Sequence, residues 1–169
     1  MTPSSIDFRP LARIDHAALR HNLMRVRSAA PGRRIWAVVK ANAYGHGLIE
    51  VAMGLAPAAD GLAVARIDEA LALRRAGVRG PILVLEGPHD PTELEQASRQ
   101  ALEIVVHQPF QAELLQAARL PQPLPVWLKV DTGMHRLGLA PAAAAELGAR
   151  LRDCSNCSGA PRWLTHLAN

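Results

Sequence analysis

The chain has 169 residues, of which 49% are hydrophobic and 4% aromatic, and its formal net charge is +4. This length is that of one domain or of part of a larger one, with enough apolar residues for a sizeable core. No apolar run approaches the roughly 20 residues that a membrane span needs. The basic residues are scattered rather than gathered with aromatics, so we expect no nucleic-acid partner.

The N-terminal stretch MTPSSIDFRPLARID contains no apolar core of the kind that a secretory signal requires. We therefore expect a soluble, cytoplasmic protein without a membrane partner. Residues 1–10 are expected to form an N-terminal tail, and residues 11–169 to form the folded domain.

The first half of the chain alternates between helix-like stretches and short apolar runs. In chain order, the pattern predicts a helix capped by Asp15, a strand at 36–39, a helix from Leu48, a strand at 62–65, and a helix capped by Asp68 and ended by Gly77. Most of the runs are apolar on both faces, which is typical of parallel strands covered on both sides.

The second half continues the alternation. It predicts a strand at 82–85, a helix opened by Asp90 and Pro91, a strand at 104–106, a helix from Pro109, a strand at 126–128 with Val130, a helix from Pro141, and a strand at 163–165. Capping residues followed by proline at the first helical position mark helix starts. This β/α alternation indicates right-handed crossovers and a parallel sheet.

Polar residues follow or adjoin each of the six predicted strands. They are Lys40, Arg66, Glu86, His107, Asp131 and His166. The C-terminal ends of the strands carry the active site in a (β/α)₈ barrel, whereas no GxGxxG motif supports a dinucleotide-binding sheet. A full barrel needs about 250 residues. We therefore expect an α/β fold, an incomplete TIM-type (β/α)₈ barrel of about six βα units, whose open strand edges favour self-association or marginal stability.

Seventeen of the nineteen basic residues are arginine, and the two lysines, Lys40 and Lys129, both follow apolar runs. Lysine can lose its proton and form an imine, whereas arginine effectively does neither. Lys40 is thus a candidate nucleophile that could hold an aldehyde cofactor. Tyr44, the only tyrosine of the chain, could donate a hydrogen bond to a phosphate from the same loop. The alternative is that both lysines are structural.

The two cysteines form a single CxxC motif, Cys154 and Cys157. A lone CxxC can be a redox pair or half of a zinc site. No second CxxC or HxxxH motif follows to complete four zinc ligands. We expect no metal site, and two free thiols in a surface loop.

The segment VVKANAYGHG, residues 38–47, resembles the pyridoxal-phosphate attachment motif of alanine racemases, and VWLKVDTGMHRLG, residues 126–138, closely resembles the family's fifth-strand motif. Three further segments are similar to the family more weakly: ARIDHAALRHNL, GLAVARIDEALALRRAG and LTHLAN. The family's enzymes have a (β/α)₈ barrel followed by a β-rich C-terminal domain. The resemblance covers about three-quarters of that barrel, and we expect the C-terminal β domain to be absent from this chain.

The resemblance implies roles for five residues of this chain. Lys40 matches the lysine that binds pyridoxal 5'-phosphate as a Schiff base and then acts as one of two bases at the alanine Cα. Tyr44 matches a tyrosine that binds the cofactor phosphate, and His166 a histidine in the network below the pyridine ring. Arg136 matches an arginine near the cofactor phenolic oxygen and the substrate carboxylate. Lys129 matches a lysine that carries a carbamate in many members, the alternative here being an ion pair with Asp131 or Glu86.

The resemblance implies an isomerase that interconverts L- and D-alanine for peptidoglycan precursor synthesis, as a homodimer in the full-length protein. The second base of the family is a tyrosine of the partner's C-terminal domain, and the sole tyrosine here is Tyr44. We therefore expect the 169-residue chain to be inactive alone. A racemase of another amino acid and a pyridoxal-phosphate homeostasis protein are the alternatives, although the latter class lacks the DTGMHRLG stretch. His46 and His135 are expected to be solvated loop residues.

Overall fold

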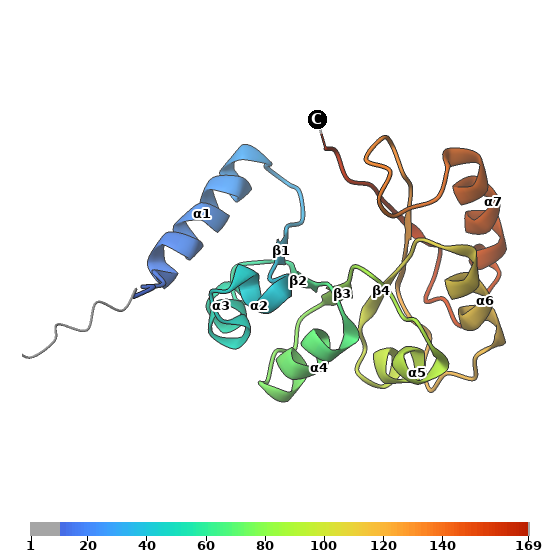
Figure 1. Ribbon diagram of the computed structural model, residues 1–169, viewed down its shortest axis with the longest axis horizontal. Helices are drawn as coiled ribbons and strands as arrows, with labels where there is room; N and C mark the ends of the chain where they lie inside the picture. Colours follow the sequence, from blue (N-terminus) through green and yellow to red (C-terminus); the bar gives the residue numbers. More distant parts are fainter. Residues whose placement is uncertain (1–10, 169) are drawn as a thin grey trace, which may run out of the picture.

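The computed structural model describes residues 11–168, so the expected tail at 1–10 lies outside the described residues. Six strands form one parallel sheet in the order β1-β2-β3-β4-β5-β6. Their bounds are β1 Trp36–Val38, β2 Gly61–Val64, β3 Ile82–Val84, β4 Glu103–Val106, β5 Val126–Lys129 and β6 Arg162–Leu164. The predicted strands are confirmed, and the sheet curls into part of a TIM-type barrel with helices on its outer side (Figure 1).

One helix precedes the first strand and the others lie between strands; the sequence predicts all of them except the short one at 40–44. They are α1 His16–Ala29, α2 Lys40–Tyr44, α3 Leu48–Leu55, α4 Ile67–Arg75, α5 Pro91–Arg99, α6 Pro109–Ala117 and α7 Pro141–Arg152. Asp15 caps α1 through hydrogen bonds from the Ala17 and Ala18 amides, and Asp90 caps α5 by accepting from Glu93 N at 2.8 Å. These caps satisfy amides that have no partner inside the helix.

One predicted cap is wrong. Asp68 lies inside the first turn of α4, and Arg66 occupies the N-cap position. The carboxylate that accepts backbone amides at this helix start is that of Glu69, one residue further along, which receives hydrogen bonds from Ala65 N and Arg66 N. Gly77 follows the end of α4 in the left-handed region at φ +96°, as a residue that closes a helix does.

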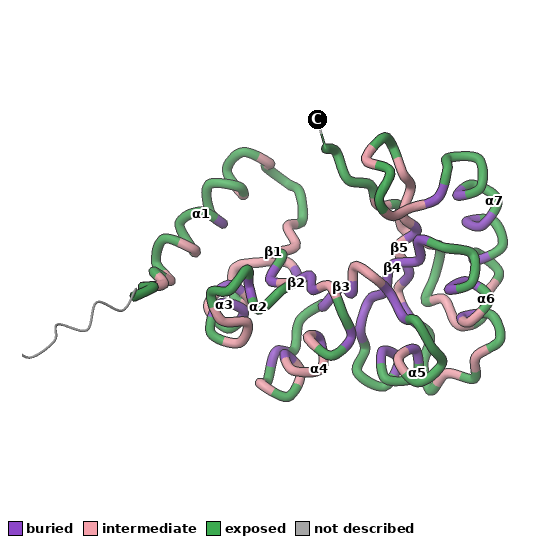
Figure 2. The backbone as a smooth tube through the Cα atoms, viewed as in Figure 1, coloured by how far each residue is buried: buried purple, intermediate pink, exposed green. Residues whose placement is uncertain are grey.

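The main core lies between the sheet and the helices, where buried residues line the inner faces of both (Figure 2). A smaller cluster fills the concave side of the sheet, with Trp36 and Trp127 in edge-to-face contact at 5.5 Å between ring centroids. The buried Glu103 accepts hydrogen bonds from Trp127 Nε1 at 2.6 Å and Arg162 Nη1 at 3.0 Å. These contacts join β4, β5 and β6 below the strand ends.

The cysteines are free and lie in the loop between α7 and β6, as expected, but both are half-buried, and Cys157 forms a β-bridge with Leu124. Burial, together with the neighbouring Cys154, raises the pKa of the Cys157 thiol to about 12, so it is a poor nucleophile. Within residues 11–168, no group of three or more His, Cys, Asp or Glu side chains could hold a metal ion. Within the same residues, no helix has the length and apolar character to cross a membrane.

Candidate functional site

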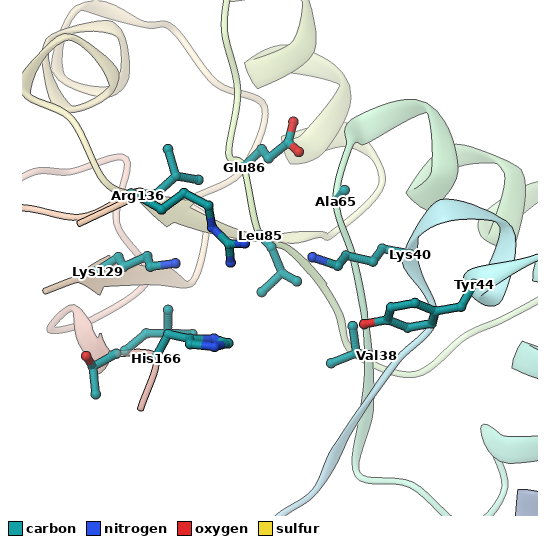
Figure 3. Close-up of a pocket in the computed structure, with 12 residues that line it drawn as sticks. Val38, Lys40, Tyr44, Ala65, Leu85, Glu86, Lys129, Arg136 and His166 are labelled. Carbon is teal, nitrogen blue, oxygen red and sulfur yellow. The ribbon is translucent and has the colours of Figure 1, made fainter. Parts of the chain in front are cut away.

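A cavity of about 380 Å³ opens at the C-terminal ends of the strands. Seven of the residues that line it carry polar groups: Lys40, Tyr44, Glu86, Lys129, Arg136, Thr165 and His166. The tips of Lys40 and Tyr44 extend from one wall toward Lys129, Arg136 and His166 on the other (Figure 3). The structure therefore brings together all five residues to which the resemblance gives a role.

The backbone directly after Lys40 is left-handed, and this conformation directs the Lys40 side chain into the cavity. Ala41, Asn42, Ala43 and Tyr44 all have positive φ, between 52° and 56°, which makes α2 a left-handed turn. L-residues rarely adopt this conformation, at a cost of roughly 1–2 kcal/mol each. Strain of this size persists only where the surroundings impose it, and it is concentrated at functional sites.

Glu69 is the main residue that holds this turn to the sheet. Its Oε1 accepts from Ala41 N at 2.6 Å, while its Oε2 accepts from Ala65 N at 2.9 Å. One carboxylate thus binds the backbone directly after Lys40 and the end of β2. Sequence reasoning missed this role, although a glutamate at the third position of a helix that follows a strand is a recognisable capping signal.

Two side chains close the turn from its other end. Asn42 Oδ1 accepts from Leu48 N at 2.8 Å, which ties the turn to the start of α3. His46 Nδ1 lies 2.9 Å from Ala43 O, so this nitrogen donates to the carbonyl. His46 is exposed, as expected, but it also supports the turn that positions Lys40.

Lys129 lies across the cavity at the end of β5 and is half-buried. Its pKa is lowered, mainly by desolvation and further by the positive charges of Arg136 and Lys40, while Asp131 opposes the shift. Within the part of the chain that the structure describes, Lys129 makes no ion pair with Asp131 or Glu86. The neutral amine is therefore more accessible here than at an exposed lysine.

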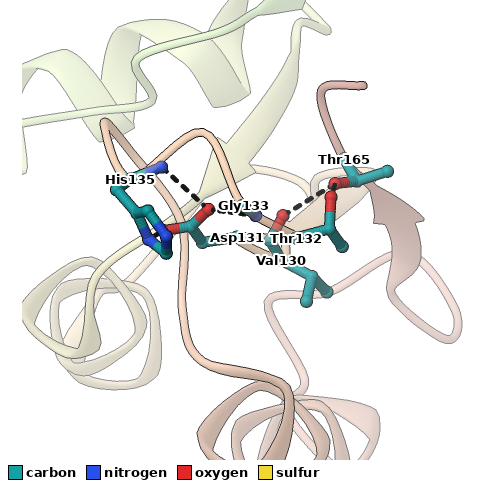
Figure 4. A network of polar contacts seen from close by, with 6 residues as sticks. All are labelled: Val130, Asp131, Thr132, Gly133, His135 and Thr165. Carbon is teal, nitrogen blue, oxygen red and sulfur yellow. Dashed lines mark hydrogen bonds and ion pairs between the residues drawn. The ribbon is translucent and has the colours of Figure 1, made fainter. Parts of the chain in front are cut away.

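Arg136 stands on the loop after β5, which the Asp131 carboxylate organises (Figure 4). Asp131 Oδ1 accepts from Gly133 N and His135 N, both at 3.0 Å, and Oδ2 pairs with His135 Nδ1 at 3.0 Å. These bonds lower the pKa of Asp131, which keeps the carboxylate charged. His135 is exposed, as expected, but it forms this pair rather than being solvated alone.

The same loop is tied to β6 and closed at its far end. Thr165 Oγ1 donates to Val130 O at 3.0 Å and lies 2.7 Å from Thr132 Oγ1 (Figure 4), which fixes the chain next to His166. Gly138 has φ +126°, and a Cβ there would lie 2.7 Å from Asp131 N. Glycine is required at this close approach.

Three of the six predicted strand-end residues do not line the cavity. Arg66 is exposed at the start of α4, and Asp131 serves its own loop. His107 is buried below the cavity, where its ring hydrogen-bonds to Glu86 O. Lys40, Glu86 and His166 do line it. Three of the six strand-end residues therefore gather at the cavity, as the barrel pattern predicts, whereas the other three have structural positions.

The family model described as "Alanine racemase, N-terminal domain" matches residues 14–169. The chain belongs to this alanine racemase N-terminal domain family. An alanine racemase of Nitrosococcus oceani is 51% identical over 160 residues, and a biosynthetic alanine racemase of Salmonella typhimurium is 48% identical over 155 residues.

Solved alanine racemases have the same fold in this region. The biosynthetic alanine racemase of Pseudomonas aeruginosa superimposes with a TM-score of 0.87 at 43% identity over 92% of this chain. The enzyme of Bacillus anthracis, solved with bound L-Ala-P, gives a TM-score of 0.80 at 31% identity over 95%.

The chain spans less than half the length of the alanine racemases that it matches. It covers 45% of the Nitrosococcus protein and 43% of each of the Salmonella, Pseudomonas and Bacillus proteins. The family resemblance and the partial-barrel fold expected from the sequence are thereby confirmed.

Proposed function

We propose that this chain is the cofactor-binding barrel portion of a pyridoxal-phosphate-dependent alanine racemase, an isomerase that interconverts L- and D-alanine. One observation carries the proposal: Lys40 and Lys129, the only lysines of the chain, extend with Arg136 into one cavity at the strand ends. The names of the relatives and the L-Ala-P bound to the Bacillus anthracis enzyme support alanine as the substrate.

The residues present suit pyridoxal 5'-phosphate. A cavity of about 380 Å³ lies in the size range of small-molecule sites. It offers a primary amine for the aldehyde, the exposed Tyr44 hydroxyl for the phosphate, and the Arg136 guanidinium for the phenolic oxygen. When bound, the cofactor supplies an electron sink that makes the alanine α-proton removable.

The side chains of this chain then have separate tasks. Lys40 Nζ would hold the cofactor through its aldehyde, and as a free amine it would move a proton at the alanine Cα on one face. Arg136 binds the substrate carboxylate with its planar fork of donors. His166, which lines the same cavity, would hydrogen-bond in the network beside the cofactor ring. Glu69 acts indirectly, since it holds the turn that points Lys40 inward.

Lys129 is proposed to carry a carbamate. Its neutral amine nitrogen forms a bond to the carbon of CO₂ and releases one proton, which turns a cation into an anion. Its lowered pKa favours the neutral amine, and the positive charges of Arg136 and Lys40, which contribute to that shift, would stabilise the resulting carboxylate. The anion can then hold Arg136 in place.

We further propose that the full-length protein acts as a cytoplasmic homodimer whose D-alanine feeds peptidoglycan precursor synthesis. Racemisation needs a base on each face of Cα, and Lys40 supplies one. Tyr44, the only tyrosine of the chain, is already assigned to the phosphate. The 169-residue chain should therefore bind the cofactor but form no measurable D-alanine.

Titration of the chain with pyridoxal 5'-phosphate, followed by absorbance, tests the proposal. The wild-type chain should develop the band of a covalent adduct, and Lys40→Ala should not. Tyr44→Phe should weaken binding about tenfold, because a hydrogen bond to a charged group contributes about 1.5 kcal/mol or more. The matched control is Lys129→Arg, which should keep the band.

Absence of the band in the wild-type chain would contradict cofactor binding, and D-alanine formation would contradict the expected inactivity.

A further inference from the structure

His107 occupies a position beside Lys129 that the assigned roles do not explain. In the β4–β5 ladder, Val106 pairs with Leu128, so His107 follows at the level of Lys129. The preceding pair with the same orientation, Val105 and Trp127, packs together on the concave side of the sheet. Because side chains alternate along a strand, the side chains of His107 and Lys129 are neighbours on that same side.

The hydrogen bonds around His107 determine which ring nitrogen carries the proton. The buried Gln111 accepts from His107 N at 2.9 Å through Oε1, so its Nε2 is the donor to Glu86 O and Pro88 O. His107 Nε2 also lies 2.9 Å from Glu86 O. A carbonyl only accepts, so His107 Nε2 must carry the proton, and in the neutral ring Nδ1 has a free lone pair.

That Nδ1 atom is buried and has no hydrogen-bond partner among residues 11–168. The residue is 4% exposed, and desolvation lowers the pKa of the ring, with smaller contributions from the charges of Lys129 and His89. The ring is therefore neutral, and Nδ1 is an acceptor. A buried acceptor without a donor is uncommon, because it loses its hydrogen bonds to water without replacement.

Lys129 is the neighbouring group with hydrogens to donate. Its Nζ is on a flexible stem of four carbons, and it makes no hydrogen bond to another side chain or to the backbone within the described residues. An ammonium, a neutral amine and a carbamate nitrogen all retain at least one N–H. A contact to Nδ1 can therefore survive the conversion of the amine to a carbamate.

We propose that His107 is a positioning residue for Lys129, whose Nζ donates a hydrogen bond to His107 Nδ1. The chain Gln111–Glu86–His107–Lys129 then links the loops after β3 and β4 to the cavity. It fixes the position of the Lys129 nitrogen in the cavity that Arg136 also lines. The use of Lys129 in catalysis rests on the proposed function, but the contact itself does not.

Nuclear magnetic resonance of the chain labelled with ¹³C-lysine tests the contact directly. Only two side-chain Cε signals arise, and Lys40→Arg assigns them. His107→Asn keeps an acceptor at the place of Nδ1, whereas His107→Gln keeps a donor near Glu86 O and loses that acceptor. Because the acceptor stabilises the ammonium, the Lys129 titration midpoint should fall by about half a unit or more in His107→Gln and stay unchanged in His107→Asn.

Identical Lys129 titrations in all three proteins would overturn the proposal, as would equal shifts in both variants. The Lys40 signal is the internal control. If a His107 variant does not fold, ¹⁵N spectra of the wild-type ring decide instead. They should show an unprotonated Nδ1 whose resonance moves in Lys129→Met, and a protonated Nδ1 or an unmoved resonance would overturn the contact. None of these measurements depends on cofactor binding. A failure of the racemase proposal would instead be seen in the absorbance titration of the wild-type chain and Lys40→Ala with pyridoxal 5'-phosphate.

Discussion

Lys129 shows how the site changes the properties of a single residue. Its pKa is below 10.5 because the amine is desolvated and faces the charges of Arg136 and Lys40. Between the folded and unfolded pKa values, the unfolded chain binds more protons at this residue. The unfolding free energy should therefore rise with pH across this window, which ends near 10.5.

Arg136→Met should raise the pKa of Lys129, because of the two neighbouring positive charges the guanidinium makes the larger contribution to lowering it. The pH-dependent rise in stability should become smaller for the same reason. Titration of the Lys129 Cε signal measures the shift. Arg152→Met, at the exposed end of α7, is the matched control and should leave the signal unchanged. A Lys129 pKa that is equal in both variants would contradict the electrostatic explanation.

At the residue scale, the sequence predicted the side chains that enter the cavity, but it did not predict the residue that holds the turn after Lys40. Lys40 and Lys129 stood out because lysine is rare in this chain and both follow apolar runs. The role of Glu69 escaped notice because its partners are backbone amides of two different strand ends. Such amides become neighbours only after the strands pair, so spacing along the chain does not reveal them.

Among the elements, α2 departs most from what its residues prefer. Four consecutive L-residues would not keep a left-handed conformation in an isolated peptide. The hydrogen bonds of Glu69, Asn42 and His46 hold this conformation in the folded chain. The glycines at 45 and 47 indicated a loop. Nothing in residues 41–44, which lie between the strand and these glycines, indicated that the turn would be left-handed. The strained turn points Lys40 into the cavity.

Ala41→Gly should stabilise the chain or leave its stability unchanged. Glycine removes roughly 1–2 kcal/mol of left-handed strain at this exposed position and adds about 0.5–1 kcal/mol of unfolded-state entropy. The matched control is Ala143→Gly on the exposed face of α7, which should destabilise by about 1 kcal/mol. Urea unfolding of both variants measures the difference. Equal destabilisation would show that the turn is not strained.

At the scale of the whole molecule, the sheet is a curled segment of a barrel whose outer strands, β1 and β6, each pair on one side only within residues 11–168. The positions of the strands could be read from the six apolar runs, and the barrel class from the polar strand ends. The degree of curling could not, because it depends on packing such as that of Trp36 against Gly61, where a Cβ would come within 2.5 Å of the indole.

The outer strands should make the chain self-associate. Unpaired backbone groups along a parallel edge can pair with another copy, and the exposed Val38 and Trp163 add apolar surface there. Sedimentation velocity should show species larger than a monomer whose fraction rises with concentration. Trp163→Arg should reduce this association, whereas a charge introduced on α7, Ala143→Arg, should not. A monodisperse monomer that melts cooperatively would contradict this expectation.

The most direct test of the proposed chemistry is to trap the adduct between the chain and pyridoxal 5'-phosphate by borohydride reduction, and to locate the added mass by peptide mapping. The account predicts that the label is on the peptide containing Lys40, that Lys129 is not labelled, and that Lys40→Arg abolishes the reaction. Equal labelling of the two lysines, or labelling that survives in Lys40→Arg, would show that the Lys40 amine is not positioned for this bond.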